Sequence, residues 1–332
     1  MLINFFFRKA YPGYFSIESV FNNVIKDFSK DLSFKSITLP NYTSGIKNII
    51  KNIAFAVKNQ GSINHVTGDV NYISIFLNRK RTILTFHDLE SILTQSIFKR
   101  IIFYIFWIWI PVKRLKYITV ISEATKHKLI KLTRVNPNKI FVIYNGIPSE
   151  FVYTPKDFNK DCPTILQVGT TDNKNISRLL NAIKSIKCKL IIVGKLNDSL
   201  RELLVKNELN YTNYFNVSVD ELVKIYKDSD IVTFISLFEG FGLPIIEAQA
   251  TGRPVITSNL SSMPEIAGKG ALFVDPYNVE NIREGILELI QNEKLRMHLV
   301  EEGLSNIQRF KPELIAKMYM ELYEKVEREA IA

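Results

Sequence analysis

The sequence predicts an α/β protein of two Rossmann-like domains, each a doubly wound parallel sheet, that face each other across a central cleft. Its 332 residues are too many for one ordinary hydrophobic core. In both halves, short apolar runs rich in β-branched residues alternate with helical patterns, as parallel strands with crossover helices require. A polar, proline-bearing stretch at residues 145–163 separates the two sets and is typical of a linker.

Ten apolar runs are expected to form strands, five in each half. Those of the first half are Leu2–Phe7, Ile63–Val66, Thr82–Phe86, Tyr117–Ile121 and Ile140–Tyr144. Those of the second half are Thr164–Val168, Lys189–Val193, Asp230–Ile235, Pro254–Thr257 and Gly270–Val274. Helical patterns between them include Ser16–Asp31, Glu123–Leu132, Ser177–Ile186 and Val279–Gln291. We therefore expect a first domain at 1–155, a second at 156–310 and an amphipathic helix at 311–332.

Composition and cysteine content are those of a folded protein from a reducing compartment. Hydrophobic residues make up 46% and charged residues 23% of the chain, as in globular proteins. Cys162 and Cys188 are the only cysteines, so we expect no disulfide framework. No secretory signal is evident, and no run reaches the roughly twenty apolar residues of a membrane-spanning helix. These features predict a cytosolic protein.

The net charge of +10 is unevenly distributed. Residues 1–158 carry 22 Lys and Arg against 9 Asp and Glu, a net of +13, whereas residues 159–332 carry 21 and 24, a net of −3. This asymmetry indicates an anionic partner of the first half, either a nucleic acid or an acidic membrane. The acidic second half and the lack of an aromatic-basic reading motif argue against nucleic acid. A basic but merely solvated surface is the alternative.

Glycines and polar residues follow nearly every expected strand, including His87 after Thr82–Phe86 and Gly169 after Thr164–Val168. Ligands of open α/β sheets bind beyond the carboxyl ends of the strands. Since these residues recur in both halves, they predict a cleft for a large polar molecule that carries phosphate.

The stretch SLFEGFGLPIIEAQATGRPVIT, residues 236–257, adds an anion site to this edge. Pro244 suits the first turn of a helix, where its missing N–H costs nothing. The N–H groups around Phe241–Leu243 would then point at an anion, aided by the helix dipole. Gly240 and Gly242 let the backbone approach that anion closely.

Two glutamates accompany this turn. Glu247, one turn inside the helix, is suited to accept hydrogen bonds from a diol such as a ribose, because a carboxylate repels the phosphate itself. Glu239 lies just before the helix. The alternative is that Glu247 is a solvated helix residue and Glu239 a loop charge.

Several segments resemble the group 1 (family 4) glycosyltransferases, and together they cover essentially the whole chain. EGFGLPIIEA resembles the acidic motif of that family, and VITSNLSSMPEIAGKGALFVDP resembles the stretch that follows it. LQVGTTDNKNISRLLNAI resembles the phosphate-binding loop. The first-half landmarks come in the family's order, as PGYFSIESVF, HVTGD, TFHDLE, TVISEATK and IYNGIP.

The resemblance implies a two-lobed fold of the B type. The second lobe would hold a nucleotide-diphosphate sugar and the first lobe the acceptor. Transfer would proceed with retention at the anomeric carbon and would need no metal or other cofactor. The helix at 311–332 would pack back toward the first domain.

The resemblance also implies roles for individual residues. Lys174 would neutralise the donor diphosphate, Glu239 would lie close to the transferred sugar, and His87 would reach that sugar from the first lobe. Glu247 would bind the ribose hydroxyls. The implied donor site comprises Gly13, Gly169, Thr170, Lys174, Gly240, Phe241, Gly242, Leu243 and Glu247. Preorganised hydrogen-bond donors that point at the leaving diphosphate would stabilise the charge that develops there.

One position departs from the family pattern. Many members have arginine directly after the glycine of the phosphate loop, where this chain has Thr170. Lys174 would then be the main cation, assisted by Lys195 after its own strand.

The histidines indicate no metal site. His65 falls in an expected strand, His127 and His298 fall on helical patterns, and His87 directly follows a strand. Scattered in this way, they make no metal constellation. The Asp-Ser-Asp sequence at 228–230 matches an acidic metal motif, but we interpret it as the end of a helix before a strand.

FKRIIFYIFWIWIPVKRLKY, residues 98–117, is the clearest candidate for membrane contact. Its apolar run is too short to span a bilayer, basic residues flank it, and Trp107 and Trp109 suit the headgroup layer. The alternative is a buried core helix. Contact with an anionic membrane would place the protein on the inner face of the cell membrane, where a lipid-linked acceptor is available.

The leading functional hypothesis is a retaining glycosyltransferase that uses a nucleotide sugar, in bacterial surface polysaccharide or lipopolysaccharide synthesis. A sugar-nucleotide epimerase or a phosphorylase of the same fold is the second class, and a non-catalytic scaffold is the third. The sugar, the nucleotide base and the acceptor depend on pocket shape and are not predicted by these motifs.

Overall fold

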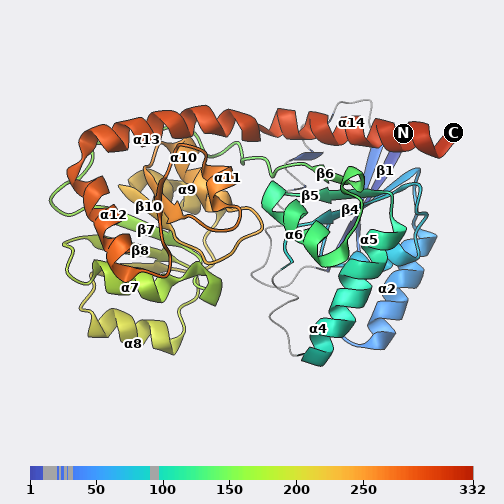
Figure 1. Cartoon of the computed structure of the whole chain (residues 1–332), viewed down its shortest axis with the longest axis horizontal. Coiled ribbons are helices and arrows are strands. Elements are labelled where there is room, and N and C mark those ends of the chain that lie inside the picture. Colours follow the sequence, from blue (N-terminus) through green and yellow to red (C-terminus); the bar gives the residue numbers. More distant parts are fainter. Residues whose placement is uncertain (10–20, 22–23, 26–27, 29–32, 90–96, 332) are drawn as a thin grey trace. The chain divides into compact units, whose positions relative to one another are not determined.

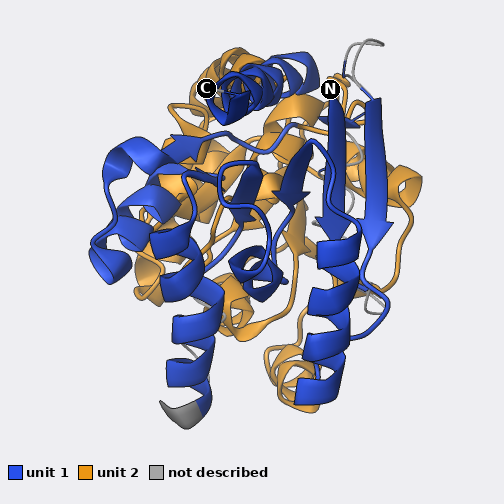
Figure 2. Ribbon diagram, turned by 90° about the vertical axis from the view of Figure 1, so that its right-hand side faces the viewer, with its two compact units in different colours: residues 1–146, 312–332 blue, residues 147–311 orange. Residues whose placement is uncertain are grey.

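The computed structural model describes residues 1–9, 21, 24–25, 28, 33–89 and 97–331. They form two compact units, residues 1–146 with 312–332 and residues 147–311. Figure 1 labels the helices and strands, and Figure 2 distinguishes the units by colour. Each unit is built on its own six-stranded parallel sheet, which confirms the predicted fold class.

The sheet of the first unit has the strand order β2-β1-β3-β4-β5-β6, with every neighbouring pair parallel. Its strands are β1 (Leu2–Phe7), β2 (Ser33–Thr38), β3 (Ile63–Val66), β4 (Thr82–Phe86), β5 (Tyr117–Val120) and β6 (Ile140–Val142). Strands β3, β4 and β5 are buried along their whole length, because helices cover both faces. The order reverses between β1 and β3, which makes this pair the topological switch point.

Two hydrophobic clusters cover opposite faces of this sheet. The helices of the first cluster are α2 (Ile46–Lys58), η1 (Asn71–Ile75), α4 (Ile97–Phe103), the π-helical turn η2 (Tyr104–Trp109), α5 (Ile110–Arg114) and α6 (Glu123–Thr133). A short turn, η3 (Pro137–Lys139), precedes β6. In the second cluster, the C-terminal helix α14 (Pro312–Ile331) packs Tyr323 against Phe5 of β1 and Tyr319 against His65 of β3. The last helix thus belongs to the first unit, as expected.

The sheet of the second unit has the order β12-β11-β10-β7-β8-β9 and is also entirely parallel. Its strands are β7 (Thr164–Val168), β8 (Lys189–Val193), β9 (Tyr211–Tyr214), β10 (Ile231–Phe234), β11 (Val255–Ser258) and β12 (Leu272–Val274). The switch point lies between β7 and β10, where the chain first adds strands in one direction and then in the other.

Helices connect these strands and begin at recognisable caps. They are η4 (Asp172–Lys174), α7 (Ile176–Ile183), α8 (Asp198–Lys206), α9 (Val219–Asp228), α10 (Leu243–Thr251), α11 (Met263–Ala267), α12 (Val279–Gln291), α13 (Glu293–Asn306) and η5 (Ile307–Phe310). Ser218 and Glu221 form a capping box at the start of α9. Pro244 lies in the first turn of α10, and Gly252 ends that helix in the left-handed conformation.

The ten expected strands are all present, with ends that shift by at most two residues. Two further strands, β2 and β9, were not predicted from sequence. Both lie at sheet edges and both are polar or exposed, so neither shows a continuous apolar run. Most of the expected helix Ser16–Asp31 lies outside the described residues.

The boundary between the units comes earlier than the sequence predicted. The first unit ends at Gly146, whereas the predicted first domain extended to residue 155. Ile147 already donates its N–H to the carbonyl of Phe310, and the ring of Phe151 packs edge-on against Tyr226. These contacts assign the intervening residues to the second unit.

Within the described ranges, no helix is both long enough and apolar enough to cross a bilayer.

Candidate functional site

Polar side chains gather at the switch point of the second sheet. The loop after β7 carries Gly169 and Lys174, and the loop after β10 carries Glu239. Because β7 and β10 are adjacent and parallel, both loops leave the same edge of the sheet. Open α/β sheets bind ligands in this position.

The loop after β7 brings Lys174 back over its own glycine. Gly169 has φ +89°, and a Cβ at this position would lie 2.8 Å from Cε of Lys174. A glycine is therefore needed both for the left-handed backbone and for the passage of the lysine chain. Nζ of Lys174 also lies 4.6 Å from the ring centroid of Phe234 at the end of β10.

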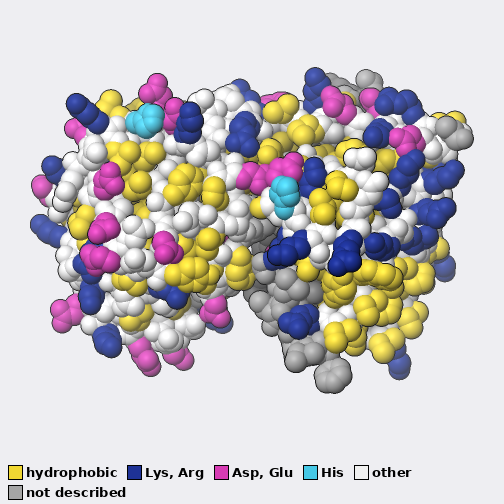
Figure 3. All heavy atoms as spheres, viewed as in Figure 1, with side chains coloured by type: hydrophobic (Ala, Val, Ile, Leu, Met, Phe, Trp, Pro, Cys, Tyr) yellow, Lys and Arg dark blue, Asp and Glu magenta, His cyan; other side chains and the backbone are white. Residues whose placement is uncertain are grey.

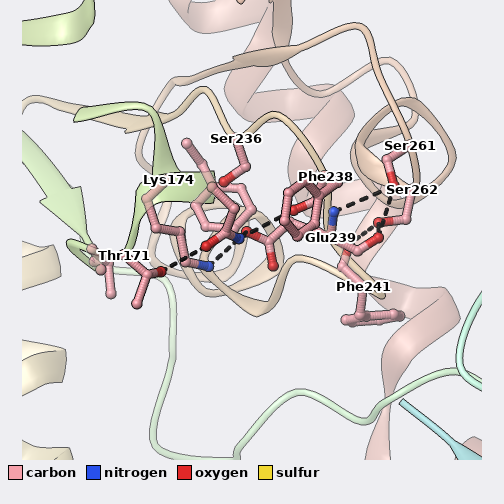
Figure 4. A network of polar contacts seen from close by, with 12 residues as sticks. Thr171, Lys174, Ser236, Phe238, Glu239, Phe241, Ser261 and Ser262 are labelled. Carbon is pink, nitrogen blue, oxygen red and sulfur yellow. Dashed lines mark hydrogen bonds and ion pairs between the residues drawn. The ribbon is translucent and has the colours of Figure 1, made fainter. Parts of the chain in front are cut away.

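Lys174 and Glu239 form an ion pair between the two loops (Figure 4). Nζ of Lys174 lies 2.7 Å from Oε1 of Glu239, and both side chains are largely shielded from solvent. The amide of Asn173 donates to the same carboxylate oxygen at 3.1 Å and to the carbonyl of Phe238 at 3.2 Å. The structure thus brings together two of the predicted catalytic residues, and it adds Asn173, which the sequence analysis missed.

Two serines hold the loop that carries Glu239 (Figure 4). Ser261 accepts from the N–H of Glu239 and donates to its carbonyl, and Ser262 donates to the carbonyl of Phe241 at 2.7 Å. Both precede α11, some twenty residues further along the chain. Only their place in the family-like stretch at 255–276 could have indicated this role.

The start of α10 lies next in the chain. Gly242 caps the helix with φ +114°, and the ring of Phe241 is buried edge-on against Phe310. Leu243 is the first helical residue, preceded by Gly240 in the half-buried loop. In the first turn of α10, Pro244 has no N–H and the N–H of Ile245 donates to the carbonyl of Gly242 at 3.0 Å. What this turn offers an anion is therefore chiefly the positive end of the helix dipole.

Thr170, in the loop after β7, contacts the loop after the neighbouring strand β8. Its hydroxyl donates to the carbonyl of Lys195 at 2.7 Å, in the loop after β8. A Cβ on Gly194, which has φ +148°, would lie 2.8 Å from Cγ2 of Thr170. Thr170 therefore joins the β7 and β8 loops.

Glu247 is buried on the inner face of α10, which contradicts the alternative of a solvated helix residue. The hydroxyl of Tyr226, on α9, donates to its Oε2 at 2.6 Å. Burial raises the pKa of Glu247 to about 7, while the Tyr226 hydrogen bond and the charge of Lys174 act in the opposite direction. The carboxyl therefore changes charge near neutral pH. No sequence signal links Tyr226 to Glu247.

His87 belongs to the first unit, directly after β4. Its Nε2 lies 2.6 Å from the carbonyl of Thr67, and its ring packs edge-on against Phe21. A Cβ on Gly68 would meet the His87 ring at 2.6 Å, so this glycine makes room for it. Gly13, the other predicted site residue of this unit, lies outside the described residues.

His65 lies in β3, the strand expected from sequence, and has a structural environment. It is fully buried, with Nδ1 2.7 Å from the hydroxyl of Tyr323 on α14 and Nε2 2.7 Å from Oγ1 of Thr85. Burial, together with the smaller effect of the charge of His87, lowers the pKa of His65 to about 3. The ring is therefore neutral at physiological pH and links the C-terminal helix to the sheet.

The described residues contain no group of three or more His, Cys, Asp and Glu side chains placed to hold a metal ion. In the Asp-Ser-Asp sequence, Asp230 is buried and forms an ion pair with Lys156. It also accepts from the N–H groups of Asn159 and Thr164. Asp230 thus orders the segment that leads into β7.

Comparison with known proteins gives two family matches that together span most of the chain. The model of glycosyl transferases group 1 matches residues 153–305, and the model of glycosyltransferase family 4 matches residues 63–151. The first match contains the switch point, Lys174, Glu239 and Glu247.

Curated relatives agree with these matches. An uncharacterized glycosyltransferase of Methanocaldococcus jannaschii is 30% identical over 254 residues, which cover 74% of this chain and 68% of the relative. The O-antigen chain mannosyltransferase RfbU of Salmonella typhimurium is 32% identical over 227 residues. That match covers 66% of this chain and 63% of RfbU, so it spans less than two thirds of the relative.

Solved structures agree in fold. The Anabaena protein HepE, in its complex with UDP-glucose, superposes with a TM-score of 0.81 at 16% identity and covers 98% of this chain and 100% of its own. Sucrose-phosphate synthase from Thermosynechococcus elongatus also gives 0.81, at 16% identity and 98% coverage of both chains.

Proposed function

This chain belongs to the group 1 glycosyltransferases, and on that premise we propose that it transfers a sugar from a nucleotide-diphosphate donor to a saccharide acceptor with retention at the anomeric carbon. The observation that carries the proposal is the position of Lys174. Its ammonium group lies at the switch point, over Gly169 and paired with Glu239. In such a site the diphosphate of a bound sugar nucleotide would replace Glu239 as the ion-pair partner of Lys174. Glu239 would then accept hydrogen bonds from the sugar hydroxyls.

The start of α10 supplies the second part of the anion site. The positive end of its helix dipole favours a phosphate by about 0.3–1 kcal/mol. Gly240 and Gly242 leave the backbone there without side chains. As the glycosidic bond breaks, negative charge develops on the leaving diphosphate. Positively charged and hydrogen-bonding groups that are already fixed in place stabilise this charge without reorganisation.

Glu247 is proposed to bind the ribose hydroxyls of the donor. Its carboxyl is buried beside α9 and oriented by the hydroxyl of Tyr226. A carboxylate accepts two hydrogen bonds from a diol, which a phosphate group cannot donate. His87 and Gly13 are proposed to contribute from the first unit, with His87 next to the transferred sugar.

The acceptor is proposed to be a saccharide, held on a lipid, in bacterial surface polysaccharide or lipopolysaccharide synthesis. Support comes from relatives named O-antigen chain mannosyltransferases and from WaaG, a glycosyltransferase involved in lipopolysaccharide biosynthesis whose structure superposes with a TM-score of 0.73. Residues 98–117 would hold the enzyme to the anionic inner face of the cell membrane. We propose no metal, no other cofactor and no nucleic-acid partner.

A donor screen tests this proposal. A panel of sugar nucleotides is assayed by thermal shift, because a ligand that binds only the folded protein raises its midpoint. The donor that binds is then incubated with saccharide acceptors, and the anomeric configuration of the product is read by NMR. A retained configuration is expected, whereas isomerised donor without transfer would indicate the epimerase alternative.

Lys174→Ala identifies the cation. Loss of the Lys174 ammonium group is expected to lower kcat/KM for the sugar nucleotide by about 10²–10³-fold, as does removal of other groups that stabilise charge in a transition state. Lys187→Ala, an exposed lysine that precedes β8 in the same unit, is the matched control and should leave kcat/KM unchanged. Equal kinetics of the two variants would remove Lys174 from the site.

A further inference from the structure

The helical segment from α4 to α5 in the first unit has one face in the core and one in solvent. Pro111 lacks the N–H that would bond the carbonyl of Trp107, and the amide of Asn71 donates to that carbonyl instead, at 3.0 Å. The helix widens here into the π-helical turn η2. Tyr104 and Trp107 are tied inward, since they donate to the carbonyls of Leu132 and Asp69.

The two tryptophans of this segment therefore differ. Trp107 is only 7% exposed, which corrects the expectation that both suit a membrane interface, whereas Trp109 is 43% exposed. The outer face presents Ile101, Ile102, Phe106 and Trp109 to solvent. Figure 3 shows hydrophobic side chains gathered on this part of the first unit, with Lys and Arg along their border.

Helix α2, which the sequence analysis did not single out, has a second exposed apolar face. Ile46 is 76% exposed, Ile50 59% and Val57 40%, and their spacing of four and seven residues places them on one side of the helix. The opposite side buries Asn52 and Ala56.

Helix α2 and η2 are linked through η1. The amide of Asn52 donates to the hydroxyl of Tyr72 at 3.0 Å, and the Tyr72 ring lies 4.7 Å from that of Trp107. Phe76, at the end of η1, is itself 52% exposed. Both α2 and α4 run past the arrowheads of the first unit's strands (Figure 2). The two apolar faces thus belong to one end of this unit.

The charges around these faces have one sign. Residues 33–68 and 97–122 contain no Asp or Glu. They contain exposed basic residues on the helices themselves: Lys47, Lys51, Lys58, Lys99, Arg100 and Lys113. Each basic residue near an anionic lipid surface contributes about 1 kcal/mol, and apolar side chains enter the layer below the headgroups.

We propose that the outer faces of α2 and α4–η2 form one docking surface for an anionic lipid bilayer. The proposal rests on the proposed membrane contact of residues 98–117 for its partner and extends it to α2. With two apolar ridges that lie at the same end of the first unit, the enzyme would dock in a defined orientation, which a single helix does not impose. The carboxyl ends of the first unit's strands, where His87 lies, would then face the lipid.

Flotation of the full-length protein with vesicles tests this surface. Wild-type protein is expected to float with vesicles that contain phosphatidylglycerol and to stay behind with pure phosphatidylcholine vesicles. The double variant Ile46→Ser/Ile50→Ser should lose roughly tenfold or more of its vesicle partitioning, since two exposed apolar side chains no longer insert. The α4–η2 variant Ile101→Ser/Phe106→Ser should lose a comparable factor.

The matched control is Val205→Ser, which changes a 73% exposed apolar residue on α8 of the second unit and should float like wild type. Circular dichroism and the thermal midpoint of each variant exclude unfolding as the cause. Wild-type binding that the α2 variant leaves intact would overturn the proposal, as would binding to neutral vesicles alone or to neither. Concentration-dependent self-association that the α2 variant abolishes would assign the face to a second copy and also overturn it.

Donor binding by the same variants separates this proposal from the proposed function. The thermal shift with the sugar nucleotide should be unchanged in the α2 variant, because the donor site lies in the second unit. Loss of flotation with intact donor binding supports the docking surface, whereas intact flotation without any donor response would leave the surface standing and end the transferase proposal.

Discussion

His65 in the first unit and Glu247 in the second are both buried side chains bonded to a tyrosine, yet burial shifts their pKa values in opposite directions. Burial lowers the pKa of His65 to about 3 and raises that of Glu247 to about 7. In each case the environment favours the neutral form. His65 therefore stays neutral at every physiological pH, whereas Glu247 gains its charge close to neutrality.

Their surroundings explain the difference in use. His65 lies in the middle of β3 and binds the C-terminal helix through Tyr323, so its neutral ring is a fixed part of the core. Glu247 lies one turn inside α10, the helix that follows β10, and the charge of Lys174 lowers its pKa. The same doubly wound architecture thus supports a structural polar group in one unit and a chemically responsive one in the other. Function depends on which edge residues each sheet carries.

The largest expected contrast is in catalysis. Glu247→Gln should lower kcat/KM for the donor by about a hundredfold, because a hydrogen bond to a charged acceptor is worth about 1.5–3 kcal/mol. His65→Gln, the corresponding change in the first unit, should leave kcat/KM within a few-fold of wild type. Steady-state kinetics at saturating acceptor measure both, and similar losses in the two variants would refute the separation of roles.

Tyr226→Phe sharpens the same contrast. Removing the hydroxyl that lowers the pKa of Glu247 should move that pKa further up, so the fall in activity toward acid pH should begin at a higher pH. The pH profile of kcat/KM is the readout, and a profile identical to that of wild type would contradict the link between the two residues.

The next effect is on stability and has opposite signs in the two units. The folded pKa of His65 lies below its unfolded value of 6.5, so stability is present above pH 6.5 and is lost as pH falls toward 3. The folded pKa of Glu247 lies above its unfolded value of 4.5, so stability is present below pH 4.5 and is lost as pH rises toward 7. Each contribution is on the order of 2 kcal/mol between pH 5 and pH 7.

In the wild-type protein these two contributions oppose each other across that range. His65→Gln should therefore unmask a loss of stability from pH 5 to pH 7, and Glu247→Gln a gain. Denaturant unfolding of each variant at the two pH values measures the slopes. Slopes of the same sign in both variants would show that one of the two side chains is solvated and titrates normally.

A smaller effect is expected at Asn173, whose amide donates to Glu239 and is expected to position that carboxylate. Asn173→Ala removes two hydrogen bonds to the loop after β10 and a third from the hydroxyl of Thr171, and it should lower kcat/KM by about tenfold. The control is Asn207→Ala, directly after α8 in the same unit, which removes two side-chain hydrogen bonds, to Leu180 and Asn181. Both variants should lose stability, but only Asn173→Ala should lose activity. Equal activity in the two would leave Asn173 without a positioning role.

These residues also show which features of the structure can be predicted from the sequence. The central strands were predicted because parallel strands buried on both faces are continuous apolar runs, as in β3 and β4. Gly169, Gly240 and Gly242 were found because close backbone approach needs glycine at particular places. The edge strands β2 and β9 carry no such pattern, since their side chains face solvent or are polar.

Contacts between segments that are distant in the sequence could not be predicted from it. The pairing of Glu247 with Tyr226 joins residues on two different helices, and the ion pair of Lys174 with Glu239 depends on the adjacency of β7 and β10. Trp107 and Trp109 differ in exposure because residues two apart on a helix point to different sides, and the apolar run around them does not show which side faces the core. The burial that shifts each pKa is likewise a property of the folded chain.

The smallest expected effect is that of metal removal. If Lys174 and the start of α10 supply the positive charge that the leaving diphosphate needs, a chelator should change kcat by less than about twofold. The Asp-Ser-Asp sequence at 228–230 is the alternative, as a candidate metal-binding site. The variant Asp230→Asn distinguishes charge stabilisation by Lys174 from charge stabilisation by a metal. The carboxylate of Asp230 binds Lys156 and two backbone N–H groups, so the variant should lose stability and retain kcat. Activity that is abolished by EDTA and restored by Mg²⁺ would transfer the charge-stabilising role from Lys174 to a metal.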